Sequence, residues 1–246
     1  MDHLIYTAMT GANAAEQRQS VLANNLANAS TNGFRAEIAT FRSVPLRGDG
    51  ATTRVFALTA TAGFKDTPGP TQYTGRNLDA AVRGQSWFGV QGLDGTEAYT
   101  RNGAFEVSPE GNLVTGNGLT VLSDAGSPMA VPAGASITLG TDGTVTAKVG
   151  NQPANSLGRV KMVTPTAEDP LKRGDDGLFR STSGDPLPTD ATASLQPGAL
   201  ESSNVNSIET MVQMIQGARQ YEAQIKLLQS AEANDKSGTQ LLSMQG

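Results

Sequence analysis

Residues 3–31 read HLIYTAMTGANAAEQRQSVLANNLANAST and contain no proline and one internal glycine. Steps of three and four along this stretch meet Ile5, Ala8, Ala12, Ala15, Gln19, Leu22, Leu26 and Ala29. Every position except Gln19 is apolar, which gives an a/d stripe sustained over four heptads. The stretch therefore predicts a long N-terminal helix that packs against a partner helix. We expect it to end near Gly33, where a left-handed residue can close it.

A second proline-free segment follows Pro197. Its series in steps of three and four is Met211, Met214, Ala218, Tyr221, Ile225 and Leu228, and a second apolar row of Ile208, Val212 and Ile215 lies beside it. Asn206 with Glu209 three positions later fits a capping box, although Ser207 is a competing N-cap. We predict a C-terminal helix from about residue 206 to 243 that pairs with the N-terminal helix.

The region between the two helices predicts β structure. All 12 prolines lie between Pro45 and Pro197, and short β-prone runs alternate there with glycine-rich turns. The spacing of about 8–12 residues favours a compact all-β domain over βαβ units. Asp142-Gly143 indicates a hairpin, 108–112 indicates a turn, and no internal repeat is evident. We expect Trp87 and its neighbour Phe88 in the β core.

The predicted fold class is α+β, with long N- and C-terminal helices paired as a coiled coil and an all-β domain inserted between them. The predicted divisions are 1–33 as the N-terminal coiled-coil helix, 34–75 as an extended linker and the start of the β domain, 76–198 as the all-β domain and 199–246 as the C-terminal coiled-coil helix. Residues 200–246 and 1–33 together would form an inner helical domain.

The composition argues against several function classes. The 246 residues include no cysteine and a single histidine, His3, which disfavours a cysteine nucleophile, a Ser-His-Asp triad and a multi-histidine metal centre. The formal net charge is −5 and no segment is strongly basic, so we expect no nucleic-acid partner. No apolar run approaches the ~20 residues of a membrane span. We predict no catalytic, cofactor or metal site.

One stretch is unusual for a helix end. Residues 23–35, ANNLANASTNGFR, place four asparagines in nine positions. Asparagine is a poor residue inside a solvated helix because its side chain competes for backbone hydrogen bonds. Packed against a partner, the amides can fix register and orientation. We therefore expect some of these side chains to bond between helices or subunits.

Three blocks in order resemble the bacterial flagellar axial proteins of rod and hook. They are ANNLANASTNGFR (Ala23–Arg35), TGRNLDAAVRGQSWFGVQGLDGTEAYTRNGAFEVSPEGNLVT (Thr74–Thr115) and LESSNVNSIETMVQMIQGARQYEA (Leu200–Ala223). The opening MDHLIYTAM and the ending QLLSM are similar to proximal-rod members. Only about 32 residues separate Phe41 from Thr74, which argues against the longer insertion of distal-rod members.

The resemblance implies a structural subunit of the proximal rod. Family members assemble helically in the periplasm, with paired terminal helices forming the inner tube around the export channel and β domains outside. The rod transmits torque. Implied partners are the chain itself, other proximal and distal rod proteins and, during secretion, the flagellar type III export apparatus. Export proceeds without a cleaved signal peptide, and no direct membrane insertion is expected.

We expect the assembly interface at heptad positions, in the amide run and in the matched C-terminal block. The residues are Ile5, Leu22, Asn24, Asn25, Leu26, Asn28, Thr31, Gly33, Phe34, Asn204, Val205, Asn206, Met211, Met214, Ile215, Tyr221, Ile225 and Leu228. Three alternatives stay open: a distal-rod or hook-type member of the same family, a secreted β-rich adhesin, and a glycan hydrolase with a converging acid pair. The RGD tripeptides at 47–49 and 173–175 would matter to an adhesin, but we interpret both as turns.

Overall fold

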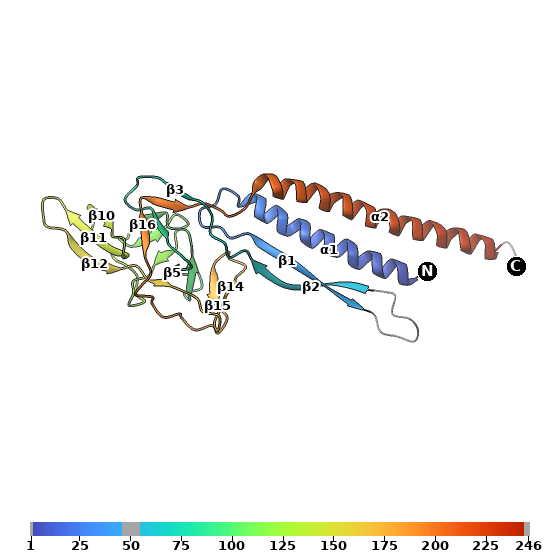
Figure 1. The fold of residues 1–246 in the computed structure, drawn as a ribbon, viewed down its shortest axis with the longest axis horizontal. Helices are drawn as coiled ribbons and strands as arrows, with labels where there is room; N and C mark the ends of the chain where they lie inside the picture. Colours follow the sequence, from blue (N-terminus) through green and yellow to red (C-terminus); the bar gives the residue numbers. More distant parts are fainter. Residues whose placement is uncertain (1, 46–54, 244–246) are drawn as a thin grey trace. The chain divides into compact units, whose positions relative to one another are not determined.

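The computed structural model describes residues 2–45 and 55–243 and divides into two compact units. Unit 1 draws on Met1–Ala29, Ala36–Lys65 and Val205–Gly246, and unit 2 on Ser30–Arg35 and Asp66–Asn204. Figure 1 traces the chain from blue to red through these segments. Because the segments alternate along the sequence, the chain passes between the units four times. The structure confirms an α+β fold with a helix at each end and β structure between them.

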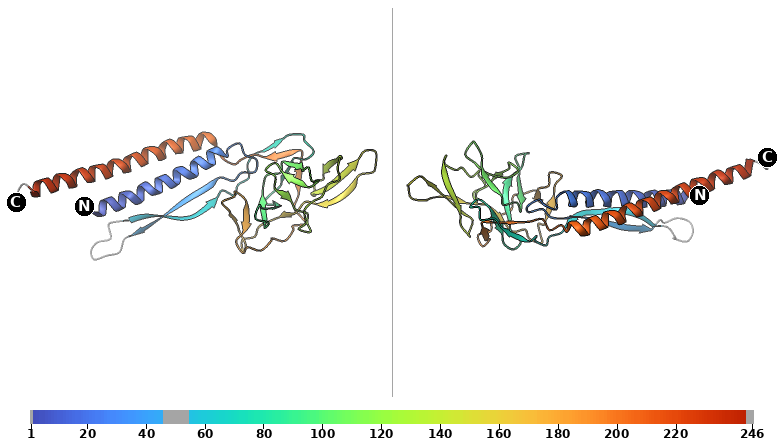
Figure 2. Two further views of the ribbon diagram at one scale, coloured as in Figure 1. Left: turned by 180° about the vertical axis from the view of Figure 1, so that it is seen from behind. Right: turned by 90° about the horizontal axis from the view of Figure 1, so that it is seen from above.

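Two antiparallel helices run side by side in unit 1 (Figures 1 and 2), α1 (Asp2–Ala27) and α2 (Ser207–Ser243). The buried side chains of α1 are Ala8, Ala12, Ala15, Leu22 and Asn25. The first four belong to the predicted stripe. Their small size lets the backbones approach closely, but each alanine removes little apolar surface from water.

Helix α1 ends at Ala27, earlier than the predicted end near Gly33. The amide of Ala29 donates to the carbonyl of Leu26, an i to i+3 bond that tightens the last turn. Gly33 has the positive φ of 71° that a helix end would use, but it lies in unit 2. Its amide donates to the Glu201 carbonyl at 2.7 Å instead of to a helix carbonyl.

Helix α2 begins as the capping residues predict. The Asn206 side-chain oxygen accepts from the amides of Ile208 at 3.1 Å and Glu209 at 3.2 Å, so Asn206 is the N-cap and Ser207 is not. Four members of the predicted series, Met214, Ala218, Ile225 and Leu228, are half-buried, whereas Met211 and Tyr221 are exposed. Among the α2 residues whose side chains are described, the fully buried ones are Thr210, Gly217 and Ala231.

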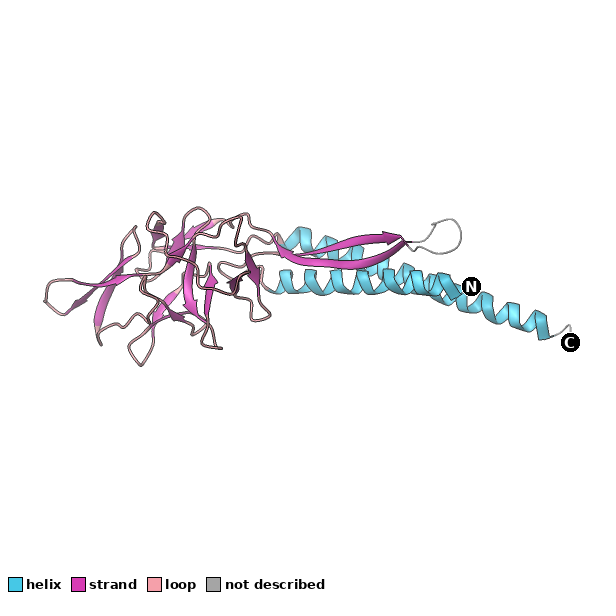
Figure 3. Cartoon of the chain, turned by 90° about the horizontal axis from the view of Figure 1, so that it is seen from below, coloured by secondary structure: helices cyan, strands magenta, loops and turns pink. Residues whose placement is uncertain are grey.

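Unit 1 also holds an antiparallel hairpin of β1 (Glu37–Pro45) and β2 (Val55–Phe64), which contacts α1 (Figure 3). Burial largely alternates along β1, as expected for a strand with one covered face. The predicted division treats 34–75 as a linker and the start of the β domain. The structure instead places 36–65 in the same unit as the helices.

Unit 2 is all antiparallel β structure. Its strands are β3 (Thr71–Tyr73), β4 (Ala80–Val82), β5 (Trp87–Gln91), β6 (Glu97–Thr100), β7 (Phe105–Val107), β8 (Leu113–Thr115), β9 (Thr120–Val121), β10 (Ala135–Leu139), β11 (Thr144–Val149), β12 (Asn155–Arg159), β13 (Met162–Val163), β14 (Leu171–Arg173), β15 (Phe179–Ser181), β16 (Leu195–Pro197) and β17 (Ala199–Glu201). The largest sheet has the order β14-β15-β6-β5-β9-β8-β7, with β13 also paired to β5. A three-stranded sheet β10-β11-β12 and the pairs β16-β4 and β17-β3 complete the unit.

The core of unit 2 lies around β5. Trp87, Phe88 and Val90 on this strand have no exposed surface, which confirms the expected core positions of Trp87 and Phe88. Phe88 packs edge-on against Phe105 with ring centroids 5.0 Å apart. Such an edge-to-face pair stabilises a core beyond its buried area.

One turn geometry recurs through unit 2, although no repeat is evident from the sequence. In each case the first amide donates to the fifth carbonyl, and the fourth amide donates to the first carbonyl. The fourth residue is always a glycine with positive φ, as a type I turn with a G1 bulge requires. The turns are 92–96, 108–112, 115–119, 123–127, 140–144 and 174–178. They include both turns that the sequence predicts.

Candidate assembly interface

An apolar stripe on the first turns of α2 is exposed. Ile208, Met211, Val212 and Ile215 are 75%, 51%, 49% and 57% exposed. Their spacing of i, i+3, i+4 and i+7 puts them on one face of the helix. Fully burying a large apolar side chain is worth roughly 1.5–3 kcal/mol, so this face has a strong tendency to acquire a partner. We call these four residues the α2 stripe.

The contact between α1 and α2 contains two matched pairs of glycine and glutamine. A Cβ on Gly11 would lie 3.2 Å from the side chain of Gln224 on α2. A Cβ on Gly217 of α2 would lie 3.7 Å from the side-chain oxygen of Gln19 on α1. Each glutamine therefore packs where the opposite helix has no side chain. This explains why Gln19 can interrupt the apolar stripe of α1.

The amide run bonds mainly within unit 1. Asn25 is buried, donates to the Glu37 carbonyl at 2.9 Å and accepts from the Glu37 amide at 2.8 Å. The side-chain amide thus exchanges two hydrogen bonds with the backbone of Glu37, as the backbone of a neighbouring strand would. Asn28 donates to the backbone and side-chain oxygens of Asn24 in the same helix. Asn25 therefore bonds to a strand of unit 1 and not to another helix.

Two chain segments far apart in sequence meet in unit 2. Besides the bond from Gly33 to Glu201, the Asn204 amide donates to the Phe34 carbonyl at 3.2 Å. The Asn204 side chain donates to the Thr67 carbonyl at 2.8 Å. Glycine is required at position 33 because a Cβ there would clash with the backbone of Arg101. The predicted interface residues Gly33, Phe34 and Asn204 therefore have a structural role within one chain.

A buried charge cluster lies beneath these segments. Glu201 forms an ion pair with Arg35, whose Nη2 lies 3.0 Å from Oε1, and its Oε2 accepts a hydrogen bond from Arg101 at 3.1 Å. All three side chains are at most 3% exposed. Arg101 also donates to the carbonyls of Val82 and Gly84. Arg35 donates to the Thr67 carbonyl. One carboxylate thus compensates two buried guanidinium groups.

The indole of Trp87 supports the same cluster. The guanidinium carbons of Arg35 and Arg101 lie 5.7 and 5.2 Å from the ring centroid, which are cation–π distances. Burial lowers the pKa of Arg101 to about 10, against the opposing effect of Glu201. Burial also lowers the pKa of Arg35. Both directions reflect the cost of removing a cation from water.

The cluster was missed by the sequence reasoning. Its three charged members come from three sequence regions, at positions 35, 101 and 201, and nothing local distinguishes them from surface charges. The available signal is that each lies in one of the three blocks that carry the family resemblance. Charged residues inside apolar-rich blocks are expected to be paired when buried.

The other predicted interface residues lie at varied depths in unit 1 or at its edge. Leu22 is buried, Leu26, Val205, Met214, Ile225 and Leu228 are half-buried, and Asn24, Asn206, Met211, Ile215 and Tyr221 are exposed; Thr31, in unit 2, is half-buried. The Ile5 side chain lies outside the part that the structure describes.

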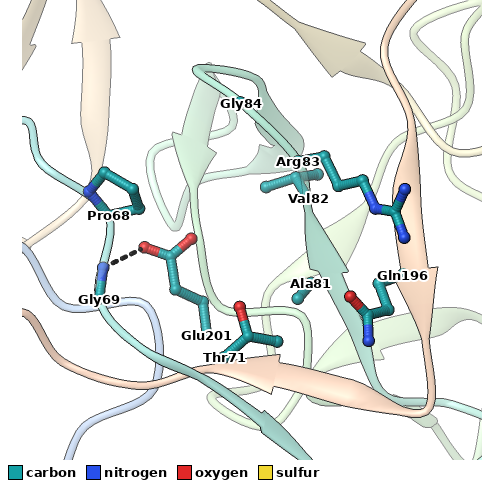
Figure 4. Close-up of a pocket in the computed structure, with 9 residues that line it drawn as sticks. All are labelled: Pro68, Gly69, Thr71, Ala81, Val82, Arg83, Gly84, Gln196 and Glu201. Carbon is teal, nitrogen blue, oxygen red and sulfur yellow. Dashed lines mark hydrogen bonds between the residues drawn. The ribbon is translucent and has the colours of Figure 1, made fainter.

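A pocket of about 250 Å³ opens in unit 2 beside Glu201 (Figure 4). Pro68, Ala81 and Val82 form its apolar walls, and Arg83 lies on the side away from Pro68. The Glu201 oxygens are committed to the two arginines and to the Gly69 amide, at 3.1 Å. The carboxylate is therefore fully engaged in contacts within the chain.

Other functional readings find little support in unit 2. Arg173 of the second RGD tripeptide lies over the ring of Phe34, 4.7 Å from its centroid, so it is not extended toward a receptor. Residues 47–49 lie outside the described residues. Within 2–45 and 55–243, no cluster of acidic residues and histidine suits a metal ion. No helix in those ranges has the length and apolarity of a membrane span.

Three family models match the chain. "Flagella basal body rod protein" matches residues 5–35, "Flagellar hook protein FlgE/F/G D1 domain" matches 81–147, and "Flagellar basal body rod FlgEFG protein C-terminal" matches 196–241. The flagellar basal-body rod protein FlgF of Escherichia coli strain K12 is 45% identical, over 99% of this chain and 100% of that protein. FlgF of Salmonella typhimurium is 43% identical over the same shares. FlgG of Buchnera aphidicola from Schizaphis graminum is 31% identical over 93% of this chain and 95% of that protein.

The two end helices, the β unit between them and the three matched models define the class, an axial structural protein of the bacterial flagellum. The chain belongs to the flagellar basal-body rod protein family, and within it the chain is most like FlgF. It is a structural subunit of the proximal rod in the flagellar basal body and interacts with other rod components. The family is structural and not enzymatic.

Proposed function

We propose that this subunit assembles helically through its terminal helices, which pair as a coiled coil and line an export channel in a torque-transmitting rod. The observation that carries the proposal is the α2 stripe, four large apolar side chains exposed on one helix face. In water this face is unfavourable, and a helix from a neighbouring rod subunit would cover it.

The same proposal covers how the subunit reaches its place. The chain travels through the flagellar type III export apparatus without a cleaved signal peptide and joins the rod in the periplasm. The lack of cysteine supports this route, because an unfolded chain in an oxidising compartment is then safe from wrong disulfides. Its contacts there are with itself and with other proximal and distal rod proteins. The 31% identity with FlgG keeps a distal-rod role as the alternative.

The test is a charge placed in the α2 stripe. We expect Ile215→Asp to abolish incorporation into basal bodies, because the carboxylate would have to leave water when the face is covered. Unit 2 should keep its free energy of unfolding, since Ile215 is 57% exposed and belongs to unit 1. The readouts are swimming and the presence of the chain in purified hook–basal bodies.

The matched control is Gln216→Asp, which replaces the exposed polar residue one position away. It adds the same charge and should swim like the unaltered protein. If Ile215→Asp incorporates as well as Gln216→Asp does, the α2 stripe is not part of the assembly interface.

A further inference from the structure

One turn of unit 2 exposes a leucine side chain to water, and a second turn is bonded to it. Leu93, in the turn 92–96 between β5 and β6, is 93% exposed, more than any other large apolar side chain described. Bonds from within the turn and from strand β15 fix its conformation. Asp94 accepts from the Thr96 amide at 3.0 Å and from the Thr96 hydroxyl at 2.8 Å. Arg180 of β15 donates to Asp94 at 3.0 Å.

Arg180 also joins this turn to the turn 174–178. It donates to both oxygens of Asp176, at 3.1 and 2.8 Å. Bidentate arginine–carboxylate bonds fix geometry as well as adding energy. Leu93 therefore lies on a turn that is already fixed by its neighbours. Less conformational entropy is lost when a partner binds it.

The charge of the two turns is negative. They contain Asp94, Asp175 and Asp176 and no basic residue, and Arg180 is shared between two of these aspartates. The surface around Leu93 therefore suits a partner that offers an apolar pocket within a positive surround.

The same unit contains such a pocket. Pro68, Ala81 and Val82 supply apolar walls, and Arg83 stands exposed among the lining residues (Figure 4). Arg35 and Arg101 lie close behind, with Glu201 and the nearby Asp66 as the opposing charges. Because Arg35 and Arg101 are buried and paired, the exposed guanidinium of Arg83 is what gives the pocket its positive surround.

The two surfaces lie apart in unit 2. Strand β3, which borders the pocket, lies at the upper edge of the unit in Figure 1, and β14 and β15 lie at its lower edge. Neither surface can therefore reach the other within one copy. A contact between them joins different copies head to tail, and such heterologous contacts build open helices when they do not close into a ring.

We infer that Leu93 of one copy of this chain inserts into the Pro68–Ala81–Val82 pocket of a second copy, with the aspartate turns facing Arg83. The inference rests on the proposed assembly into a rod and specifies one contact within it. The contact is formed by unit 2, so it is separate from the α2 stripe.

The lack of cysteine allows a direct test. In flagellated cells whose only copy is the double variant Leu93→Cys/Thr71→Cys, oxidation of isolated basal bodies should give disulfide-linked dimers and longer ladders. Thr71 lines the pocket and is exposed. A mixture of copies that carry only Leu93→Cys with copies that carry only Thr71→Cys should give dimers and no ladder. The matched control Leu93→Cys/Lys148→Cys, with an exposed residue outside the pocket, should stay monomeric.

The outcomes separate this inference from the proposed function. If the chains incorporate into basal bodies and the Leu93/Thr71 pair gives no more cross-link than the Lys148 control, the contact is wrong while the rod assembly stands. If the unaltered chain is absent from basal bodies, the proposed function itself fails. If the cysteine variants do not incorporate, the swimming of Leu93→Arg and Leu93→Met cells tests the contact instead. The contact predicts loss of swimming for arginine, which meets the positive surround, and normal swimming for methionine; equal behaviour of the two overturns it.

Discussion

At the scale of single residues, Glu201 is the ion-pair partner that two buried arginines of unit 2 share. Its backbone carbonyl also receives the Gly33 amide, and its side chain receives the Gly69 amide. Breaking a buried ion pair on one side is far more costly than never having had one, since a buried charge is left without a partner.

Glu201→Gln should therefore destabilise unit 2 by about 3–5 kcal/mol. Chemical denaturation followed by the fluorescence of Trp87, the single tryptophan, measures this directly because both arginines lie over its ring. Glu106→Gln is the control. Its carboxylate is 60% exposed and 3.8 Å from Arg76, so the loss should stay within about 1 kcal/mol. Equal losses for the two variants would contradict the role of the cluster.

Asp190 makes unit 2 sensitive to acid. Hydrogen bonds from the Thr164 hydroxyl, at 2.7 Å, and from the hydroxyl and amide of Thr192 lower the pKa of Asp190 from 3.8 to about 2. These donors favour the charged carboxylate in the folded chain. Because the folded pKa lies below the unfolded one, the stabilisation is complete above about pH 4 and is lost as the pH falls toward 2.

Asp190→Asn should therefore lower the free energy of unfolding at pH 7, and the difference from the unaltered chain should shrink between pH 4 and pH 2. Urea denaturation across this range measures the difference at each pH. Asp185→Asn, at an exposed position, serves as the comparison. A difference that stays constant down to pH 2 would show that the threonine bonds do not distinguish the charged carboxylate.

The sequence predicted the role of single residues where the interaction is local, but not where the partners are far apart along the chain. Asn206 as N-cap and Trp87 in the core follow from local pattern and apolarity, and the structure confirms both. The partners of Glu201 did not follow, since they are 100 and 166 positions away. Some asparagines of the amide run were expected to bond between helices or subunits, and Asn25 instead bonds to β1, which lies in the range predicted to be a linker and the start of the β domain.

At the scale of elements, a glycine on each helix sets the packing between α1 and α2, and replacing each by alanine tests this packing. Gly217→Ala should increase helix content, because alanine is favoured over glycine by about 1 kcal/mol and the new Cβ would meet Gln19 at an ordinary 3.7 Å. Gly11→Ala should gain less, since its Cβ would press on Gln224 at 3.2 Å. Far-UV circular dichroism of the full chain measures both. A larger gain for Gly11 would contradict the matched packing of glycine and glutamine.

The elements themselves were predictable where the periodicity was strong. Four of the five α1 side chains described as buried, Ala8, Ala12, Ala15 and Leu22, belong to the predicted a/d stripe, and the two helices lie in the proline-free ends. The sequence of α2 carries two adjacent apolar rows, and it did not indicate that Ile208, Val212 and Ile215 would be exposed while Met214, Ala218, Ile225 and Leu228 are half-buried. The six repeated turns share little more than a glycine at the fourth position, which is too weak a signal to find without the backbone.

At the scale of the whole molecule, the two units should differ in stability when the chain is alone. The α1–α2 contact relies on alanines and glycines, whereas unit 2 has a core of large side chains around Trp87. Native-state amide exchange of the purified full chain should show fast exchange in α1 and α2 and slow exchange in β5 and β6. Strong protection of both terminal helices would contradict the proposal that they become ordered on assembly.

Because Glu201 comes late in the chain, unit 2 can fold only after synthesis has passed residue 201. A truncated product that stops before residue 201 still carries Arg35 and Arg101 but lacks their counter-charge, the last strand β17 and helix α2. Such a fragment would have to bury Arg35 and Arg101 without their ion-pair partner, with only the nearby Asp66 as an opposing charge, so it would stay open. Open chains are the preferred substrates of cellular proteases, so incomplete subunits would be degraded before they could be added to the rod as defective copies.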